Sequence, residues 1–485
     1  MMSEPKRLHP ITIFYEIMSA LKELIIPFIL FVIIGNSGDD SFWNKVPLFI
    51  FILLIVAMIV SGFIKWLRFT YWLEDQELRI TQGLFVRKKR YIPFERIQSL
   101  DLSEGIFHRP FQLVKVKVET AASSDNKAEA ELTAIHKEEA AALQKIIADA
   151  KRGKNAEDVE EEVIEEVVYK ITTPQLFFLA TTSGRAGVVI SAFLAFIFQF
   201  EDFIPYEKVF NEMQELIRYG VLFISAIVFV VLVIAWLISV LIAFFKYNDF
   251  TVKKVENDLI ITRGLLEKRT TTVPLHRIQA LKITESPIRQ PFGYASVKIE
   301  SAGGTVMEED SSSIDLLPVV KKSQIPDILG EVLQEFSFVT DLKPAPKKSL
   351  RRYLFVKVLI AFVATIVLSA TFWPYGLLAC ILIGGAAVWG YAQFRSAGWN
   401  IHGRQLTMRF RTIEQHTVLM NKNRIQAFDM SVNWFQDRAD LAGVEAKVKS
   451  GEAFERGHIP HIEQEAAQEI YKWYSHREFT KSEQA

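Results

Sequence analysis

The sequence contains almost no cysteine and carries no net charge. Its one cysteine, Cys380, excludes a disulfide framework and fits domains kept on the reducing side of a membrane. The 56 basic and 56 acidic residues balance, so bulk charge gives no argument for nucleic-acid binding. A signal-peptide layout is also missing, because the first ten residues are polar and no small-residue cleavage site follows the first apolar run. We therefore expect that run to stay as a membrane anchor.

The motifs of common catalytic and metal sites are missing as well. No P-loop, G-x-S-x-G or H-E-x-x-H pattern occurs, and no nucleophile–base pair is evident. His458 and His461 flank Ile459-Pro460, which prevents a helical ligand pair, and no cysteine lies nearby. The sequence thus predicts a protein that is not an enzyme and that needs no cofactor or metal.

Apolar residues, by contrast, are abundant and lie in long runs. A bilayer core takes about 20 apolar residues per helix. The run 358–394 is long enough for two helices and breaks at Trp373-Pro374-Tyr375-Gly376. The other predicted spans are 46–64 and 219–245, and two weaker ones at about 17–34 and 181–200. Together they predict six helices in three hairpins.

Basic residues lie on one side of these hairpins. They follow the first two pairs and surround the third, whereas the loops within the pairs are poor in them. The flanking residues are Lys65, Arg68, Lys246, Lys253, Lys254, Lys347, Lys348, Arg351, Arg352, Lys357 and Arg395. Lys and Arg in short flanks mark the cytoplasmic side. We therefore expect a cell-membrane protein with both termini and all three large polar regions in the cytoplasm.

Three polar regions, 71–119, 252–300 and 399–447, align without gaps and reveal an internal repeat. Each contains the triplet Arg-Ile-Gln, at 96–98, 277–279 and 424–426. In the first two copies a glycine, a proline and a Pro-Phe pair also recur at fixed offsets, namely Gly83, Pro93 and Pro110-Phe111, then Gly264, Pro274 and Pro291-Phe292. The third copy has Arg411, Asn421 and Arg438 instead, so we expect it to keep the fold and lose some loop geometry.

Alternating apolar residues within each copy predict short strands, in copy one at 77–81, 87–92, 97–102 and 113–119. Helical segments close the copies at 136–150, 323–335 and 462–474. The predicted fold is a multi-pass α-helical membrane protein with three α+β pleckstrin-homology-like β-sandwich domains, each capped by a C-terminal helix. The expected boundaries are hairpins at 1–65, 176–246 and 354–394, domains at 66–152, 247–340 and 395–480, and linkers at 153–175 and 341–353.

The Leu-x-Ile, Gly, Pro-x-x-Arg-Ile-Gln and Pro-Phe series of copies one and two resembles the bacterial pleckstrin-homology domain of type two (bPH2, DUF304). The triple arrangement is similar to that of YdbT-type membrane proteins and covers about residues 10–475. This resemblance implies a partnership with a smaller membrane protein that carries one such domain (the YdbS type). It also implies a role in resistance to membrane-active peptides such as bacteriocins.

The Arg-Ile-Gln motif allows two interpretations. Arg96, Arg277 and Arg424 suit a phosphate or carboxylate ligand. Alternatively the motif is structural, with the isoleucine facing the sandwich and the arginine and glutamine (Gln98, Gln279, Gln426) holding the neighbouring loop.

Basic residues that follow the membrane helices form a second candidate site. They are Arg87, Lys88, Lys89 and Arg90 in copy one, Lys268 and Arg269 in copy two, and Arg404, Arg409 and Arg411 in copy three. Such clusters attract anionic inner-leaflet lipids at about 1 kcal/mol per residue. The alternative is a solvated flank that has no specific ligand.

An acidic patch occupies the longest predicted outer loop, 201–218, which contains an amphipathic segment. Its members are Glu201, Asp202, Glu207, Glu212 and Glu215. We hypothesise that these residues meet a cationic amphipathic peptide at the outer surface, against the alternative of a plain interfacial connector.

The sequence therefore favours an assembly or protection component of the membrane. Exposed strand edges make edge pairing between such domains a plausible assembly mode, within an oligomer or with the smaller partner. An anionic-lipid sensor and an accessory subunit of an export system are the alternatives.

Overall fold

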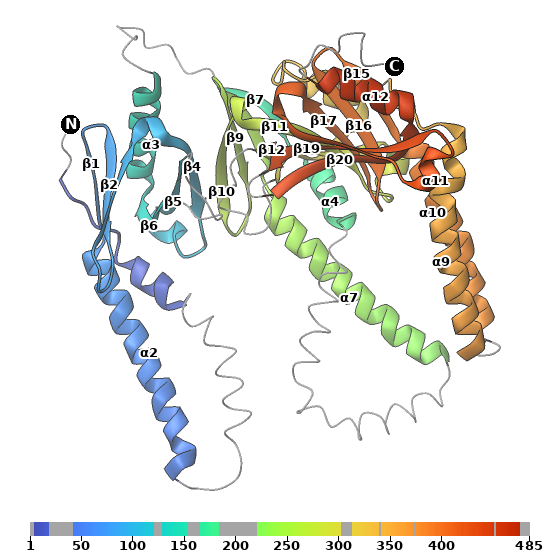
Figure 1. Ribbon diagram of the computed structural model, residues 1–485. Coiled ribbons are helices and arrows are strands. Elements are labelled where there is room, and N and C mark those ends of the chain that lie inside the picture. Colours follow the sequence, from blue (N-terminus) through green and yellow to red (C-terminus); the bar gives the residue numbers. More distant parts are fainter. Residues whose placement is uncertain are drawn as a thin grey trace. The chain divides into compact units, whose positions relative to one another are not determined.

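The computed structural model describes residues 4–18, 42–120, 129–152, 165–183, 221–301, 313–338, 341–371, 375–450 and 453–475. The chain forms two compact units, whose elements are shown in Figure 1. The first unit comprises Met1–Val163 with Leu266–Thr272, and the second comprises Ile164–Leu265 with Val273–Ala485. Each unit is described below by itself.

In the first unit a long apolar helix is followed by two groups of three antiparallel strands and a closing helix. The elements are α2 (Phe42–Arg68), β1 (Thr70–Glu74), β2 (Glu77–Gln82), β3 (Lys88–Pro93), η1 (Phe94–Arg96), β4 (Ile97–Glu104), η2 (Arg109–Phe111), β5 (Leu113–Thr120), β6 (Ala130–His136) and α3 (Lys137–Arg152). The four strands expected from alternation are confirmed as β2, β3, β4 and β5. Gly83 turns the chain between β2 and β3 at φ +131°, where a Cβ would collide with the Val86 carbonyl oxygen.

The second unit contains two further copies of this arrangement. Copy two has β7 (Glu165–Lys170), α4 (Thr173–Thr181), α7 (Val221–Tyr247), β8 (Thr251–Val255), β9 (Asp258–Arg263), β10 (Lys268–Pro274), η4 (Leu275–Arg277), β11 (Ile278–Glu285), η5 (Gln290–Phe292), β12 (Tyr294–Ser301), β13 (Ser313–Lys321), η6 (Lys322–Gln324) and α8 (Ile325–Leu329). Residues of β10 up to Thr272 belong to the first unit.

Copy three begins with a helical hairpin and ends with the helix that closes its sandwich. Its elements are β14 (Lys343–Pro344), η7 (Lys347–Ser349), α9 (Leu350–Thr371), η8 (Tyr375–Ala379), α10 (Cys380–Ser396), β15 (Gly398–His402), β16 (Gln405–Arg411), β17 (Gln415–Asn421), η9 (Lys422–Arg424), β18 (Ile425–Ser431), α11 (Trp434–Asp437), β19 (Leu441–Ser450), β20 (Ala453–Glu463) and α12 (Gln464–Tyr474).

The closing helices differ between the copies. Those expected at 136–150 and 462–474 are confirmed as α3 and α12. The helix expected over 323–335 is wrong in length, because only the five residues of α8 are α-helical. Gly330 ends α8, and glycine is a poor helix former. Val332, Leu333 and Phe336 beyond it are nevertheless buried in the core, which explains their apolar pattern.

Among the described residues, four helical stretches are long and apolar enough to cross a membrane: Phe51–Arg68, Val228–Tyr247, Lys347–Thr371 and Gly376–Ser396. The last two form a tight hairpin, visible as α9 and α10 in Figure 1, in which Thr365 Oγ1 donates to the Ala379 carbonyl at 3.0 Å. The two weaker spans, 17–34 and 181–200, fall almost entirely outside the described residues. Six helices in three hairpins therefore remain a prediction.

Candidate assembly surface

The Arg-Ile-Gln motif occupies the same local structure in all three copies. Its arginine ends a one-turn 3-10 helix (η1, η4 or η9), and its isoleucine begins the next strand. Ile97, Ile278 and Ile425 are 1%, 2% and 7% exposed and lie in the hydrophobic cores. The isoleucine therefore serves packing, as the structural interpretation expects.

The polar members of the motif do not converge on one site. Arg96 and Gln426 are exposed, whereas Gln279 donates to the carbonyl of Arg277 at 3.0 Å. The side chain of Gln98 lies outside what the structure describes. Arg424 reaches out of its own copy, because its guanidinium donates to the His276 carbonyl in η4 of copy two at 2.8 Å. One motif arginine thus connects two domains.

Those two domains share one continuous sheet within the second unit. Strand β11 of copy two pairs antiparallel with β17 of copy three, from Ala280 opposite Met420 to Glu285 opposite Gln415. The resulting sheet has seven strands in the order β13-β12-β11-β17-β16-β15-β14. An edge strand offers a row of free backbone N–H and C=O groups. Here the edge strand of each domain forms hydrogen bonds with the edge strand of the other. Edge pairing between domains is therefore present within the chain.

A polar network flanks this joined sheet. The Glu285 carboxylate accepts from Lys322 at 2.7 Å and from the Gln415 amide at 2.8 Å. Lys282 pairs with Glu455 at 2.8 Å, and Arg411 donates to Gln290. Lys322 belongs to the same copy as Glu285, whereas the contacts Glu285–Gln415, Lys282–Glu455 and Arg411–Gln290 join copy two to copy three. These three contacts make the pairing of β11 with β17 specific.

Glu300 and Ser450 form a second polar contact between the two copies. The Ser450 hydroxyl donates to the Glu300 carboxylate at 2.5 Å, and Glu300 is 1% exposed. Burial raises the pKa of Glu300, since a charged carboxylate loses its hydration there.

Two histidines are held in the neutral form. His416 lies on β17 with its Nδ1 3.2 Å from the Thr284 hydroxyl of β11, and its pKa is lowered to about 4 by burial and then by Lys282, Lys298 and Arg411. His461 on β20 also has its pKa lowered to about 4, by burial and then by Arg352, Lys357 and His458. Protonation of either ring therefore opposes folding.

Stability should accordingly fall as pH decreases from 6.5 to 4. Unfolded histidine has a pKa near 6.5, so the unfolded chain binds more protons across this window, and His416 accounts for a loss of about 2 kcal/mol at pH 5. We expect His416→Gln to reduce the drop in unfolding temperature between pH 7 and pH 5, measured by tryptophan fluorescence on protein in detergent. The raised pKa of Glu300 makes stability rise as pH decreases, which opposes the effect of the histidine. The quantity to compare is therefore the difference in unfolding-temperature drop between the variant and the parent. Identical pH slopes would contradict the assignment.

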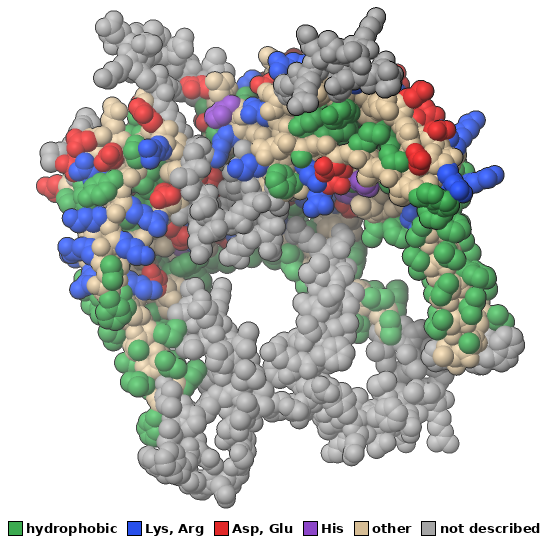
Figure 2. Space-filling view, viewed as in Figure 1, with side chains coloured by type: hydrophobic (Ala, Val, Ile, Leu, Met, Phe, Trp, Pro, Cys, Tyr) green, Lys and Arg blue, Asp and Glu red, His purple; other side chains and the backbone are tan. Residues whose placement is uncertain are grey.

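The structure separates the predicted basic patch into different environments. Figure 2 shows Lys and Arg gathered over the β1–β3 sheet next to α2. Arg87, Lys88 and Lys89 are exposed, and Arg90 donates to the Glu129 carbonyl. Lys268 and Arg269 are half-buried, since within the first unit they pair with Glu104 and Ser103 of β4. In copy three Arg404 is exposed, whereas Arg409 and Arg411 donate to Ser396. A shared membrane-facing patch of all nine residues stays a prediction.

The outer acidic patch, Glu201, Asp202, Glu207, Glu212 and Glu215, lies outside the described residues. The hypothesis that it meets cationic peptides therefore stays a prediction.

One set of polar residues was not found from the sequence. Twelve residues after the motif arginine, each copy buries a different side chain, namely His108, Arg289 and Gln436. Each one contacts a main-chain carbonyl of the copy's last strand, at Thr133, Pro318 and Pro460 respectively. The three residues occupy the same position of the gap-free repeat alignment. They were not recognised as equivalent because histidine, arginine and glutamine differ in side-chain chemistry.

Each of these buried residues is also linked to a helix that precedes its domain. The His108 ring lies 5.6 Å from the ring of Tyr15 in the helical segment 11–18. Arg289 donates to the Thr182 hydroxyl at 2.9 Å and to the Leu179 carbonyl at 3.3 Å, at the end of α4. Gln436 contacts His461, whose ring meets Tyr353 of α9 edge-on at 5.1 Å. The position thus connects each β domain to its preceding helix.

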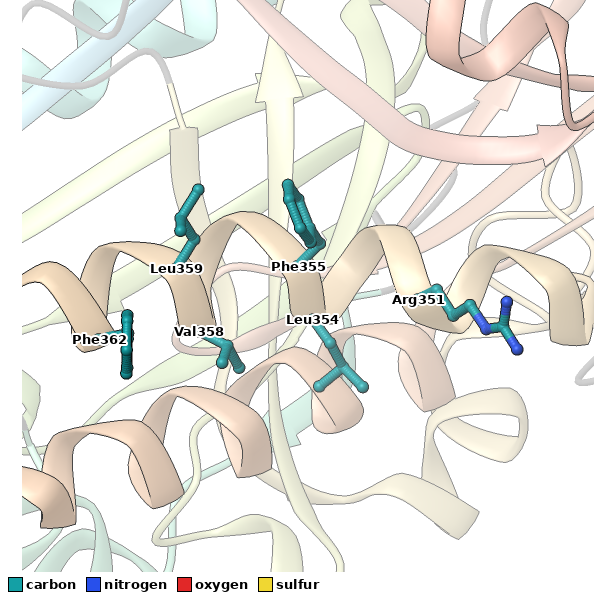
Figure 3. A pocket seen from close by; sticks show the side chains of 6 residues that line it. All are labelled: Arg351, Leu354, Phe355, Val358, Leu359 and Phe362. Carbon is teal, nitrogen blue, oxygen red and sulfur yellow. The ribbon is translucent and has the colours of Figure 1, made fainter.

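The membrane helices expose apolar surface that a bilayer would cover. Figure 2 shows hydrophobic side chains over most of α9 and α10. On α9 one helical face bears a shallow groove of about 560 Å³. Its lining residues, shown in Figure 3, are Arg351, Leu354, Phe355, Val358, Leu359 and Phe362. A single arginine at the end of an apolar stripe is typical of a lipid-facing helix whose charged head reaches the interface.

Within the part of the chain that the structure describes, no group of three or more His, Cys, Asp or Glu side chains could hold a metal ion. The polar side chains that the structure brings together instead join β domains to each other and to helices.

Comparisons with known proteins agree with the architecture. The family model described as "Bacterial PH domain" matches three times, over residues 25–151, 192–333 and 356–478. The chain is also 34% identical over 492 residues to the UPF0699 transmembrane protein YdbT of Bacillus subtilis (strain 168), covering 98% of this chain and 99% of that protein. No solved structure gave a significant match.

Proposed function

The chain belongs to the bacterial PH domain family as a transmembrane protein with three such domains, and from that premise we propose that it is a non-enzymatic assembly component of the cell membrane. Its three domains lie in the cytoplasm, and it binds a smaller membrane protein that carries one domain of the same kind. The complex protects the membrane against membrane-active peptides such as bacteriocins.

The pairing of β11 with β17 is the observation that carries this proposal. It supports a mode of docking in which two bacterial PH domains join through main-chain hydrogen bonds at strand edges. Polar side chains at the same junction, such as Glu285 with Gln415, then select the correct partner. A separate protein with one such domain could use the same chemistry. Three domains held on one chain at fixed spacing increase the strength of such binding.

The non-enzymatic part of the proposal is supported by the contacts of the buried carboxylates at the domain junction, which are structural. Gln415 donates to the Glu285 carboxylate and Ser450 donates to the Glu300 carboxylate, and these two contacts join copy two to copy three.

Co-purification tests the proposal. We expect a tagged copy of this chain, solubilised in mild detergent, to retain a co-expressed smaller single-domain relative, and cells that express both to survive a membrane-active peptide better than cells that express either alone. An unrelated tagged membrane protein is the control for nonspecific retention. Recovery of the tagged chain alone, with unchanged survival, would contradict the proposal.

A lipid sensor is the second candidate, favoured by the exposed Arg87, Lys88 and Lys89 that follow α2. Attraction of this kind is screened by salt within about 10 Å at 0.1 M. Salt-sensitive binding of the purified chain to anionic vesicles, together with no recovery of the smaller protein, would favour the sensor over the assembly component.

A further inference from the structure

The same strand pairing occurs twice in the chain, in the same register. In the second unit Glu285 of β11 lies opposite Gln415 of β17. In the first unit Glu104 of β4 lies opposite Lys268 of β10. Both glutamates stand eight residues after their motif arginine, and both partners stand nine residues before theirs. The fourth strand of one copy therefore pairs with the third strand of the next copy, and the register is the same at both junctions. We call this the pairing rule.

This rule leaves one complementary edge at each end of the repeat. Among the described strands, β3 is the outer strand of the sheet β1-β2-β3, and β18 is the outer strand of the sheet β18-β19-β20. The equivalents of β3, which are β10 and β17, both have a partner on that side, as do β4 and β11, the equivalents of β18. Tyr91 on β3 and Met430 on β18 are 54% and 37% exposed.

We propose that β18 of one chain pairs antiparallel with β3 of a second copy of this chain, in the register of the two internal junctions. Applied to these strands, the rule places Asp429 opposite Arg90 and Phe428 opposite Tyr91, and it places Val432 opposite Arg87 one residue beyond the strand ends. Opposite charges and aromatic rings are favourable cross-strand pairs. Asp429 already accepts from Lys447 at 2.6 Å, and a carboxylate has enough lone pairs to accept from Arg90 as well.

The exposed Arg96 acquires a role in this arrangement. Inside the chain, Arg424 donates to the carbonyl of His276, the residue before the motif arginine of the preceding copy. Arg96 is the equivalent of Arg424, and the residue before Arg424 is Asn423. The Arg96 guanidinium of the second copy therefore donates to the Asn423 carbonyl of the first chain.

We assign a second copy of this chain as the partner because the chain itself carries both edges, β18 with Asp429 and β3 with Arg90. The inference goes beyond the proposed function, since it does not involve the smaller protein. A head-to-tail contact of this kind repeats from copy to copy and forms a ring if it closes.

Thiol cross-linking in membranes tests the register. The chain is expressed without any smaller relative, in a Cys380→Ser background. One tagged chain carries Asp429→Cys, and a differently tagged chain carries Arg90→Cys. A short bifunctional thiol reagent should link the two chains, since directly opposite Cβ atoms lie about 5 Å apart. The matched control pairs Met430→Cys with Arg90→Cys, because a shift of one residue turns the two thiols to opposite faces of the sheet.

Arg96→Ala should lower the yield of the in-register product about tenfold, which is the expected loss for a charged hydrogen bond, and should leave expression unchanged. Equal yields for the in-register and slipped pairs would overturn the proposal. A chain that carries both in-register cysteines and links only to itself would show intramolecular closure and would also overturn it. Failure of co-purification with a smaller protein would leave this result untouched, so the two proposals can fail separately.

Discussion

Replacing Arg289 with methionine should lower the free energy of unfolding by about 3 kcal/mol. Arg289 is 9% exposed, and its guanidinium donates to the Thr182 hydroxyl and to the carbonyls of Leu179 and Pro318. Methionine keeps the apolar stem and removes all three of these hydrogen bonds. Burial lowers the pKa of Arg289, so its charge is held at a cost that these acceptors must offset. Thermal unfolding of the purified chain in detergent measures the loss.

Two further variants separate the guanidinium's geometry from its charge. Arg289→Lys keeps the positive charge but lacks the forked guanidinium that reaches three acceptors. Its unfolding temperature should therefore lie between those of the parent and of Arg289→Met. Arg404→Met removes an exposed arginine of copy three and should change the unfolding temperature little. If Arg289→Met unfolds at the same temperature as Arg404→Met, then Arg289 does not anchor α4 to its domain.

Local patterns predicted the strands of each domain well because one face of each strand is buried. Leu78 and Ile80 alternate with half-buried polar neighbours along β2, and both contribute to the core. Such alternation is a property of neighbouring residues, so it can be read without knowing the partner strand. The same reliance on local pattern explains the wrong helix prediction at 323–335. Val332 and Leu333 are buried, as they would be on the inner face of a helix, but their backbone is not helical.

The junction between copies could not be predicted residue by residue, because it depends on which strand edges meet in space. His416 and Thr284 are 132 positions apart and carry no shared motif. The position of His108, Arg289 and Gln436 was hidden for a different reason. Each side chain satisfies a carbonyl, a task that imidazole, guanidinium and amide can all perform.

Copy three shows how the repeat diverged while its sandwich persisted. Arg411 replaces the turn glycine of the other copies, and β16 extends far enough to include it as its last residue. Its guanidinium then donates to Ser396 and to Gln290 of copy two. Arg438, which replaces the second proline, stacks 3.9 Å from the Trp434 ring. Arg411 thus contacts a neighbouring copy, whereas Arg438 contacts a residue of its own copy.

Reporter fusions should give an all-or-none result for membrane orientation. Fusions after residues 152, 338 and 475, at the ends of the three β domains, should make a fluorescent protein that folds only in the cytoplasm bright and leave alkaline phosphatase inactive. The reason is the placement of charge, because Lys347 and Lys348 precede α9, Arg351 and Arg352 lie in its first turn, and Arg395 lies in the last turn of α10. Positive residues in short flanks stay on the cytoplasmic side.

The turn between α9 and α10 is the matched opposite site. A fusion at Gly376 should show active alkaline phosphatase, since the short uncharged turn is expected on the outer face. Placing a lysine or arginine at the centre of a membrane helix costs about 3 kcal/mol, so the basic flank of α9 resists transfer to the other side. Active phosphatase after residue 152, 338 or 475 would put a strand edge outside the cell, where no cytoplasmic domain could pair with it.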